Sequence, residues 1–234
     1  MSLHLNHIID VETEFIYWRH ITPIGIKVEE VTGADDKSGH TWLTMARQIY
    51  CENGRDGVFR TILHLPSGVP LLEEEETRIS ITHTRGLFAV ASLPRTPEAD
   101  LARFSVRTAM GIDAERADRE QVMRIRDKFL SAEEMDMTGD SLERCIIAWT
   151  AKEALYKAAM CQGLDWKEHI RILDLPQPGP PTLLKGAAAP PVGSAVISFP
   201  DGESLHMELY TYRSEEFIVT IACSLGCAKY SRGR

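Results

Sequence analysis

Short apolar segments rich in β-branched residues, each bounded by turn residues, constrain the fold of this chain more than any other feature. Two of them, at 78–84 and 87–93, are separated only by Arg85-Gly86, a spacing typical of an antiparallel hairpin. The pattern around them predicts a short helix at 43–50, a strand at 58–65 and a turn at 67–70. The N-terminal part of the chain is therefore expected to hold a mostly antiparallel sheet.

A second unit is expected after the polar, proline-containing stretch 94–100, and we place the seam near residue 105. Ser131 followed by Glu134 has capping-box spacing and predicts a helix that begins after Leu130. The remaining elements expected in this half are a strand at 110–112, helices at 122–129 and 141–160, an exposed loop at 176–193, and strands at 195–199, 205–212 and 217–224. The sequence thus predicts an α+β chain with an N-terminal lobe at 1–105 and a C-terminal lobe at 106–234.

Composition excludes several classes of protein. The 234 residues are 44% hydrophobic and carry a formal net charge of -8, which disfavours a general nucleic-acid binder. Five cysteines are an odd number without C-x-x-C spacing, so a disulfide framework and a structural zinc site are both disfavoured and a reducing cytoplasm is expected. The N-terminus lacks the pattern of a secretory signal, and no apolar run approaches the roughly 18 residues of a membrane span. We therefore expect a cytoplasmic protein with neither nucleic acid nor membrane as a partner.

Two carboxylates share one face of a predicted strand end in Gly111-Ile112-Asp113-Ala114-Glu115. The period of two along a strand places Asp113 and Glu115 on the same side, where they repel each other unless a cation joins them. Mg²⁺ suits such a pair because it takes oxygen ligands from one or two carboxylates together with substrate phosphates. The alternative from spacing alone is that both acids face solvent on an edge strand.

Charged and aromatic residues recur at helical spacing in the segment 149–158. At about 100° per residue, Trp149, Lys152, Glu153, Tyr156 and Lys157 fall within one arc, and alanine and leucine residues occupy the opposite side. This face would offer a third carboxylate and two ammonium groups for phosphate oxygens. The alternative is an amphipathic surface helix with an i,i+4 ion pair.

The predicted strand 79–84 ends in a histidine between two hydroxyl residues, Thr82-His83-Thr84. Threonine hydroxyls and an imidazolium can donate hydrogen bonds to a phosphate, although a histidine on a strand is more often structural.

These three segments, in this order, resemble the 4′-phosphopantetheinyl transferases of the surfactin-synthetase-activating type. The family hallmark G-[IV]-D-x-E is met at 111–115, and W-x-x-K-E-[AS]-x-x-K is met at 149–157, both without a mismatch. The stretch 129–134 is similar to the family's Phe-x-Ser-x-x-Glu segment, Gly163-Leu164 is similar to its turn after the catalytic helix, and Thr82-His83-Thr84 stands where the family has Ser-His-Ser. The resemblance runs from about residue 42 to residue 164.

The resemblance implies two pseudosymmetric lobes, each a mostly antiparallel sheet packed with helices, with the active site at their junction. It implies transfer of the 4′-phosphopantetheine group from coenzyme A (CoA) to a serine of an acyl or peptidyl carrier protein, with Mg²⁺ as cofactor. Asp113, Glu115 and Glu153 would hold the metal against the CoA diphosphate. Asp113, Glu153 and Lys157 would be catalytic, with Glu153 or a bound water taking the serine proton and Lys157 assisting the leaving phosphate.

The resemblance also assigns CoA contacts outside the metal site. Lys152 and Lys157 would neutralise the diphosphate, and His83 with Thr82 and Thr84 would hold the phosphates of the nucleotide portion. Arg47 would contact the nucleotide as well.

A basic stretch after the first motif is a candidate docking surface for the carrier protein, which is usually acidic. It contains Arg116, Arg119, Arg124, Arg126 and Lys128. The alternative is a solvated helix face, because acidic residues are interspersed in the same stretch.

Two other functions stay open at this point. A non-catalytic module that binds CoA or a carrier protein is one, because Val69 stands where the family often has a lysine. A different Mg²⁺-dependent phosphotransferase is the other, although the chain has no G-x-x-x-x-G-K-[ST] loop. Two internal lobes would make a monomer sufficient.

Overall fold

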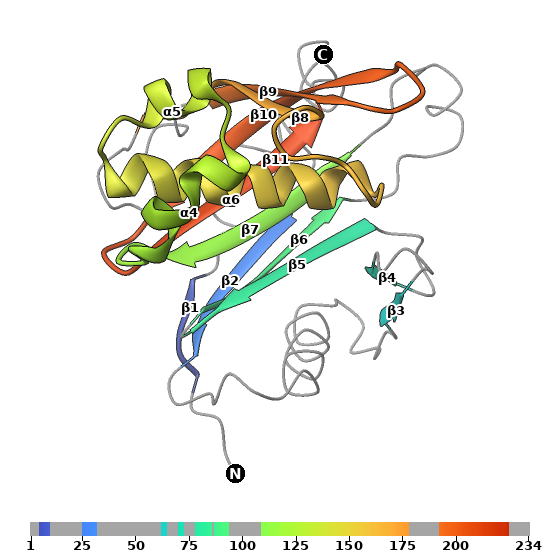
Figure 1. The fold of residues 1–234 in the computed structure, drawn as a ribbon. Coiled ribbons are helices and arrows are strands. Elements are labelled where there is room, and N and C mark those ends of the chain that lie inside the picture. The colour runs from blue at the N-terminus through green and yellow to red at the C-terminus, as the bar shows by residue number, and fades with distance from the viewer. Residues whose placement is uncertain are drawn as a thin grey trace, which may run out of the picture.

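The computed structural model of the chain describes residues 5–9, 25–31, 62–64, 70–72, 78–85, 87–93, 109–177 and 192–224. These residues form two sheets and three helices, and the helices lie with the second sheet (Figure 1). The described part is thus α+β, as predicted. Residues 94–108 lie outside it, so the seam near residue 105 and the pseudosymmetry of the two lobes stay predictions.

The first sheet has six strands in the order β1-β2-β6-β5-β4-β3, and every neighbouring pair is antiparallel. Its strands are β1 (Leu5–Ile9), β2 (Gly25–Val31), β3 (Ile62–His64), β4 (Pro70–Leu72), β5 (Arg78–Thr84) and β6 (Leu87–Leu93). The predicted hairpin is confirmed, because β5 and β6 have the expected bounds and Thr84 pairs with Leu87 across the turn. The strand predicted at 58–65 is described only at β3, and the helix predicted at 43–50 lies outside the described residues.

The second sheet has five strands in the order β7-β11-β10-β9-β8, again all antiparallel. Its strands are β7 (Met110–Arg116), β8 (Ile170–Asp174), β9 (Val192–Ser198), β10 (Ser204–Arg213) and β11 (Phe217–Ser224). The prediction for β11 is confirmed, β9 begins three residues before the predicted strand, and β8 was not predicted. β7 extends through Arg116, so both carboxylates of the first motif lie within the strand.

Three helices follow β7: α4 (Gln121–Phe129), α5 (Ala132–Thr138) and α6 (Leu142–Ala159). Side-chain oxygens of Ser131 and Ser141 cap α5 and α6, and Glu134 completes the predicted capping box of α5. Helix α6 ends at Ala159, and its C-cap residue Met160 adopts a left-handed conformation with φ of 49°. None of the helices in the described residues is long and apolar enough to cross a membrane.

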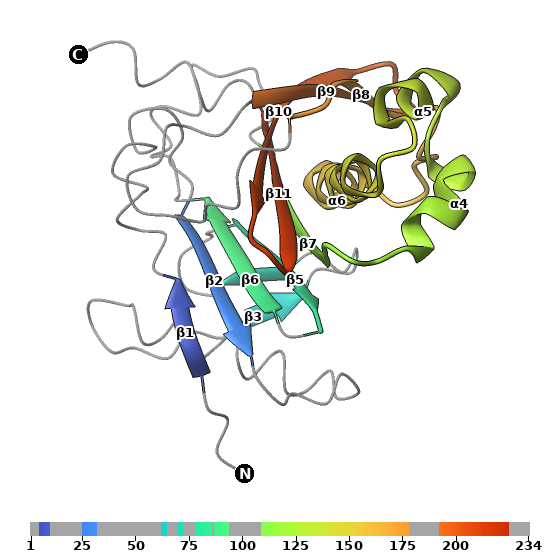
Figure 2. The ribbon, with the colours of Figure 1, turned by 90° about the vertical axis from the view of Figure 1, so that its left-hand side faces the viewer.

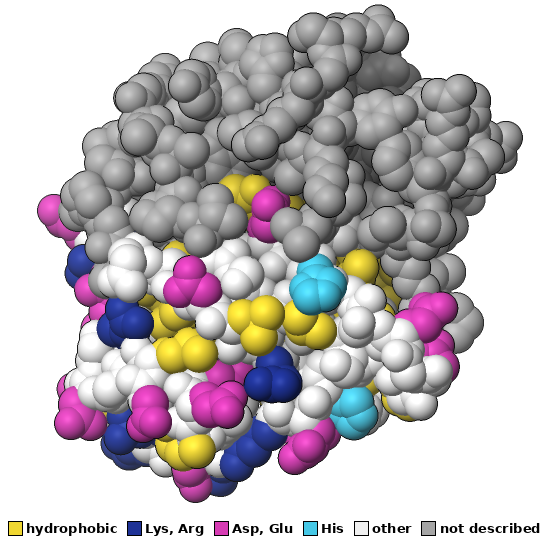
Figure 3. All heavy atoms as spheres, turned by 90° about the horizontal axis from the view of Figure 1, so that it is seen from above, with side chains coloured by type: hydrophobic (Ala, Val, Ile, Leu, Met, Phe, Trp, Pro, Cys, Tyr) yellow, Lys and Arg dark blue, Asp and Glu magenta, His cyan; other side chains and the backbone are white. Residues whose placement is uncertain are grey.

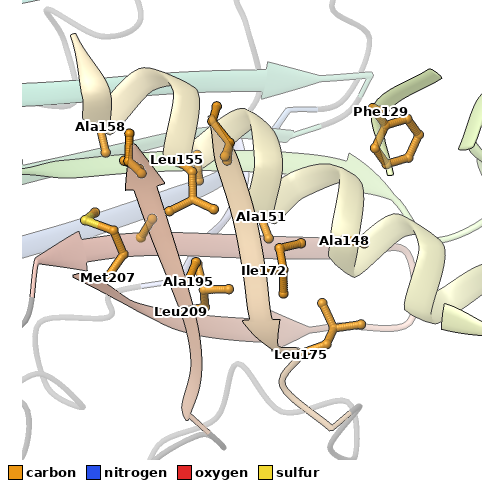
Figure 4. Packing of buried hydrophobic residues seen from close by; sticks show 14 of the residues in the cluster. Phe129, Ala148, Ala151, Leu155, Ala158, Ile172, Leu175, Ala195, Met207 and Leu209 are labelled. Atoms are coloured by element: carbon orange, nitrogen blue, oxygen red, sulfur yellow. The ribbon is translucent and has the colours of Figure 1, made fainter. Parts of the chain in front are cut away.

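The five-stranded sheet is covered on both faces, by α6 on one side and by the first sheet on the other (Figure 2). Ala151 and Leu155 of α6 face Ile172 and Leu209 of the sheet, as Figure 4 shows. A second apolar cluster joins β6 to β7, β10 and β11. This double covering explains why every residue of β11 is buried, whereas a strand with one solvated face would alternate.

Gly111 allows β7 to approach α6 closely. A Cβ atom at this position would lie 2.0 Å from the carbonyl oxygen of Ala154 and 2.8 Å from the backbone nitrogen of Ala158. Backbone atoms of a helix cannot move aside for a methyl group as a flexible side chain could. The glycine therefore sets the short separation at which Asp113 and Glu115, on the same face of β7, meet the side chains of α6.

Hydroxyl side chains of β5 join the two sheets at the free edge of β7. Ser80 Oγ accepts a hydrogen bond from the backbone N–H of Ile112 at 3.1 Å, and Thr82 Oγ1 accepts one from Ala114 at 3.2 Å. Among the described strands, β7 is the edge strand of its sheet and pairs with β11 alone, so these donors have no strand partner there. Because Ser80 and Thr82 are two positions apart on β5, both hydroxyls face β7 and accept hydrogen bonds from its buried edge without adding a strand to the sheet.

Candidate active site

The two carboxylates of β7 lie at the junction of the sheets and are buried. Asp113 and Glu115 expose only 7% and 6% of their surface, which rules out the solvent-facing alternative for this motif. Thr82 Oγ1 donates to Asp113 Oδ1 at 2.8 Å, and Thr84 Oγ1 donates to Glu115 Oε1 at 2.9 Å. The two threonines that flank His83 therefore hold carboxylates in this structure.

Helix α6 brings an ammonium group to the same place. Lys157 Nζ lies 2.7 Å from Asp113 Oδ1 and donates to the carbonyl oxygen of Ile112 at 3.1 Å. The Lys157 side chain is 30% exposed, so its ammonium group sits at the rim of the site and not in the core. It is the cation of α6 that can reach both Asp113 and a ligand that enters from solvent.

Glu153, one turn before Lys157 on α6, is the third carboxylate. Burial raises its pKa above the ordinary value of 4.5, and the negative charge of Asp113 raises it further, while Lys157 and Arg119 act in the opposite direction. The influence of Asp113 shows that the strand and helix carboxylates lie within electrostatic reach of each other. The structure thus brings Lys157 to Asp113 with Glu153 within electrostatic reach, and the metal-binding and catalytic roles of these residues stay predictions.

Lys152 is a correction to the sequence-based interpretation of α6. The helical wheel placed it on the polar face with Glu153 and Lys157, but its side chain is fully buried and pairs with Glu134 of α5. Its Nζ lies 2.7 Å from Glu134 Oε1, donates to the carbonyl oxygen of Trp166 at 2.7 Å, and also donates to that of Ile170. All three protons of the ammonium group are used inside the protein, so in this structure Lys152 contributes none to a phosphate site.

Glu134 is the partner that sequence reasoning assigned only to a helix cap. Its Oε2 accepts from the backbone N–H of Ser131 at 2.8 Å, and its Oε1 accepts from that of Ile172 at 2.8 Å in addition to Lys152. One carboxylate therefore joins α5, α6 and β8. Burial lowers the pKa of Lys152, and the adjacent charge of Glu134 works against that shift.

Arg119 completes the site, although the sequence suggested it only as a docking residue. Its guanidinium binds Glu115 Oε2 and lies over the ring of Trp149, with its central carbon 5.8 Å from the ring centroid. The i,i+4 separation of Glu115 and Arg119 was visible in the sequence, but it is informative only once β7 is known to end between them. Ser80 was missed as well, although it continues the period of Thr82 and Thr84.

An open pocket of about 370 Å³ lies beside the carboxylates. Its lining combines four groups that can carry positive charge with two carboxylates and one hydroxyl: His83, Arg85, Arg116, Arg119, Glu115, Asp118 and Thr84. His83 is exposed at this pocket, whereas Thr82 is buried behind it. Arg47 lies outside the described residues.

The predicted docking residues differ in how far other groups engage them. Arg116 pairs with Asp118 at 2.9 Å and with Glu216 at 3.5 Å. Arg126 donates to the carbonyl oxygen of Gly139 at 2.6 Å. Arg124 and Lys128, one turn apart on α4, are exposed, and the structure gives them no ion pair among the described residues.

The donor set suits a hard divalent cation. Mg²⁺ takes oxygen ligands from carboxylates and phosphates, and the buried Asp113 and Glu115 and the half-buried Glu153 supply such oxygens close to a pocket lined by basic groups. Among the described residues, no three His, Cys, Asp or Glu side chains are already gathered around one point as ligands. Lys157 and Arg119 instead neutralise Asp113 and Glu115.

At the junction of two antiparallel sheets, the structure thus brings Lys157 to Asp113 and places Glu115 in the lining of an open pocket. Residues 109–203 match the family described as the 4′-phosphopantetheinyl transferase superfamily. The matched range runs from β7 through β9 and includes Asp113, Glu115, Glu153 and Lys157. No curated protein matches the chain. Membership in the surfactin-synthetase-activating type stays a prediction.

Proposed function

We propose that the chain transfers the 4′-phosphopantetheine group of CoA to a serine of an apo acyl or peptidyl carrier protein, with Mg²⁺ as cofactor and 3′,5′-ADP as the other product. One observation carries the proposal: the β7 carboxylates are held by threonine hydroxyls of β5, Asp113 pairs with Lys157 within electrostatic reach of Glu153, and Glu115 lines an open pocket with His83 and three arginines. The superfamily match over the same residues supports it.

The pocket beside Glu115 is the proposed binding place of the nucleotide portion of CoA. His83, Arg85 and Arg116 would supply positive charge to its phosphates, and the imidazolium form of His83 would be favoured by a bound anion. Thr82 and Thr84 have a different role from the one expected, because their hydroxyls already donate to Asp113 and Glu115. They orient these carboxylates.

Asp113, Glu115 and Glu153 would hold Mg²⁺, which when bound would polarise the reacting phosphoryl group and neutralise charge on the leaving phosphate. Lys157 would move its ammonium from Asp113 toward the diphosphate, a short displacement for a partly exposed side chain. Either Glu153 or a water molecule would accept the proton of the attacking serine.

We further propose that the carrier protein docks at the exposed side of α4. Arg124 and Lys128 are exposed there and have no ion pair within the part of the chain that the structure describes, whereas Arg116, Arg119 and Arg126 are engaged. Figure 3 shows a different face, above α5, β8 and β9, where acidic and basic side chains are interspersed. Charge reversal of Arg124 and Lys128 should raise the carrier KM, and an unchanged carrier KM would contradict docking at α4.

The decisive experiment incubates the protein with CoA, Mg²⁺ and an apo carrier protein and weighs the carrier by mass spectrometry. We expect a mass gain of one phosphopantetheine arm that disappears on chelation of the metal. Asp113→Asn and Glu153→Gln should each lower kcat by about 10²-fold or more. Glu168→Gln, a matched change of an exposed carboxylate outside the site, should leave kcat unchanged.

The same assay separates the alternatives. A non-catalytic binding module would bind CoA or the carrier without any mass gain, and a different phosphotransferase would add a phosphoryl group to its acceptor instead of the arm. Either result with a folded protein would refute the proposal.

A further inference from the structure

Every oxygen of the Glu115 carboxylate is already used inside the protein. Oε1 accepts hydrogen bonds from Thr84 Oγ1 at 2.9 Å and from the backbone N–H of Arg116 at 3.0 Å, and Oε2 accepts from Arg119. Both donors to Oε1 belong to strands: the backbone N–H of Arg116 is fixed within β7, and the hydroxyl of Thr84 lies at the end of β5. Oε2, whose printed partner is the guanidinium of Arg119, is therefore the oxygen at which a cation would bind, and the cation would meet the positive charge of Arg119 there.

Arg119 is suited to leave. Its side chain is 38% exposed, whereas that of Glu115 is only 8% exposed, and residue 119 lies in the turn between β7 and α4. The guanidinium also lines the open pocket, together with His83 and Arg85. A small movement would take it from Glu115 to an anion bound in that pocket, where its charge would still be compensated.

We propose that Arg119 is the internal counter-ion of Glu115 and that a divalent cation binds at Glu115 only by displacing it. Arg119 is then a positioning residue that sets how tightly the metal binds. Without metal, its guanidinium neutralises the buried carboxylate. When metal binds, the guanidinium moves to the phosphate ligand in the pocket. This inference rests on the metal site of the proposed function, and it assigns Arg119 to that site instead of to carrier docking.

The test is a titration of the metal-free protein with Mn²⁺, followed by electron paramagnetic resonance in the absence of CoA. Arg119→Gln should bind Mn²⁺ about threefold to tenfold more tightly than the unchanged protein, because the metal no longer competes with a partly exposed ion pair. Arg119→Lys, which keeps the charge, should restore the weaker binding. Glu115→Gln should weaken binding and so establish that the titration reports this carboxylate.

Arg116→Gln is the matched control. It removes an equal charge from the same pocket, but the Arg116 side chain pairs with Asp118 and Glu216, and its backbone N–H to Glu115 remains. Its Mn²⁺ affinity should therefore change by less than about twofold, a limit that separates loss of direct contact from a general field effect. Thermal unfolding of each variant without metal checks that the fold is intact.

A second readout follows the movement itself. Because the guanidinium lies over Trp149, displacement by a diamagnetic ion such as Mg²⁺ should change the tryptophan fluorescence of the unchanged protein. Arg119→Gln and Trp149→Phe should each abolish that change.

Equal Mn²⁺ affinities of Arg119→Gln and Arg116→Gln would overturn the inference. If the carrier still gains the arm in that case, the proposed function stands and only the role of Arg119 fails. If neither the unchanged protein nor any variant binds Mn²⁺ through Glu115, the proposed metal site fails along with it.

Discussion

Replacement of Lys152 by methionine should lower the free energy of unfolding and leave CoA binding by the folded protein unchanged. The side chain is fully buried, and its ammonium contacts the carboxylate of Glu134 at 2.7 Å and two backbone carbonyl oxygens. Methionine fills similar volume but leaves Glu134 as an uncompensated buried charge. Removal of one partner from a buried ion pair costs about 3–5 kcal/mol, and the packing of methionine offsets only part of that. We therefore expect a loss of about 3–4 kcal/mol, a large fraction of the stability of an ordinary domain.

Denaturant unfolding monitored by circular dichroism measures this loss, with transferase kinetics on the same preparations. Lys167→Met, at an exposed position, should change the free energy of unfolding by less than about 0.5 kcal/mol. The double variant Lys152→Met, Glu134→Gln should recover about 1–3 kcal/mol, because it removes the orphaned charge. A loss of unfolding free energy below about 1 kcal/mol together with a raised CoA KM would refute the structural role. It would instead support contact between Lys152 and the phosphates of CoA.

Three further changes test the junction. Gly111→Ala should destabilise the protein by about 1–3 kcal/mol or more and lower kcat, since its methyl group meets the backbone of α6; unchanged unfolding would contradict the close approach. Thr82→Val should cost about 1–3 kcal/mol in denaturant unfolding and weaken Mn²⁺ binding, because Asp113 loses a donor and a strand N–H is left unpaired. Glu153→Gln should stabilise the metal-free protein at neutral pH. Because the pKa of Glu153 is higher in the folded than in the unfolded protein, the native protein loses stability as pH rises from about 4.5 through the folded-state pKa. The glutamine variant has no such loss. Its advantage in free energy of unfolding should therefore be small near pH 4 and grow toward pH 7. A difference that shrinks with rising pH would show the opposite shift.

The elements that the sequence predicted well carry local signals. The two-residue turn defined the β5–β6 hairpin, and the capping box located the start of α5. Strand β8, with the sequence Ile-Arg-Ile-Leu-Asp, was missed because its exposed charged residues weaken the apolar signal and its partner β9 follows only after a long connection. Local patterns cannot show which distant segment completes a sheet.

In the candidate site too, residues within local motifs were predictable, and contacts between distant segments were not. Asp113, Glu115, Glu153 and Lys157 were predictable because two motifs place carboxylates on one strand face and one helix face. The burial of Lys152 was not, since a helical wheel treats every lysine as polar and its partner Glu134 lies on another helix. The contacts of Thr82 and Thr84 span 31 positions in the chain, so only the docking of the two sheets could assign them to carboxylates instead of to a phosphate.

Those β5 contacts connect stability to chemistry. Thr82 Oγ1 accepts from the N–H of Ala114 at the edge of β7 and donates to Asp113, so one side chain both joins the two sheets and orients a proposed metal ligand. Changes in β5 should therefore alter unfolding and metal affinity together. Arg119 stands apart from this coupling, because it contacts Glu115 from a turn and bears on no strand edge. Its removal should change metal affinity while the sheets stay docked, and this difference identifies it as a counter-ion and not as part of the frame.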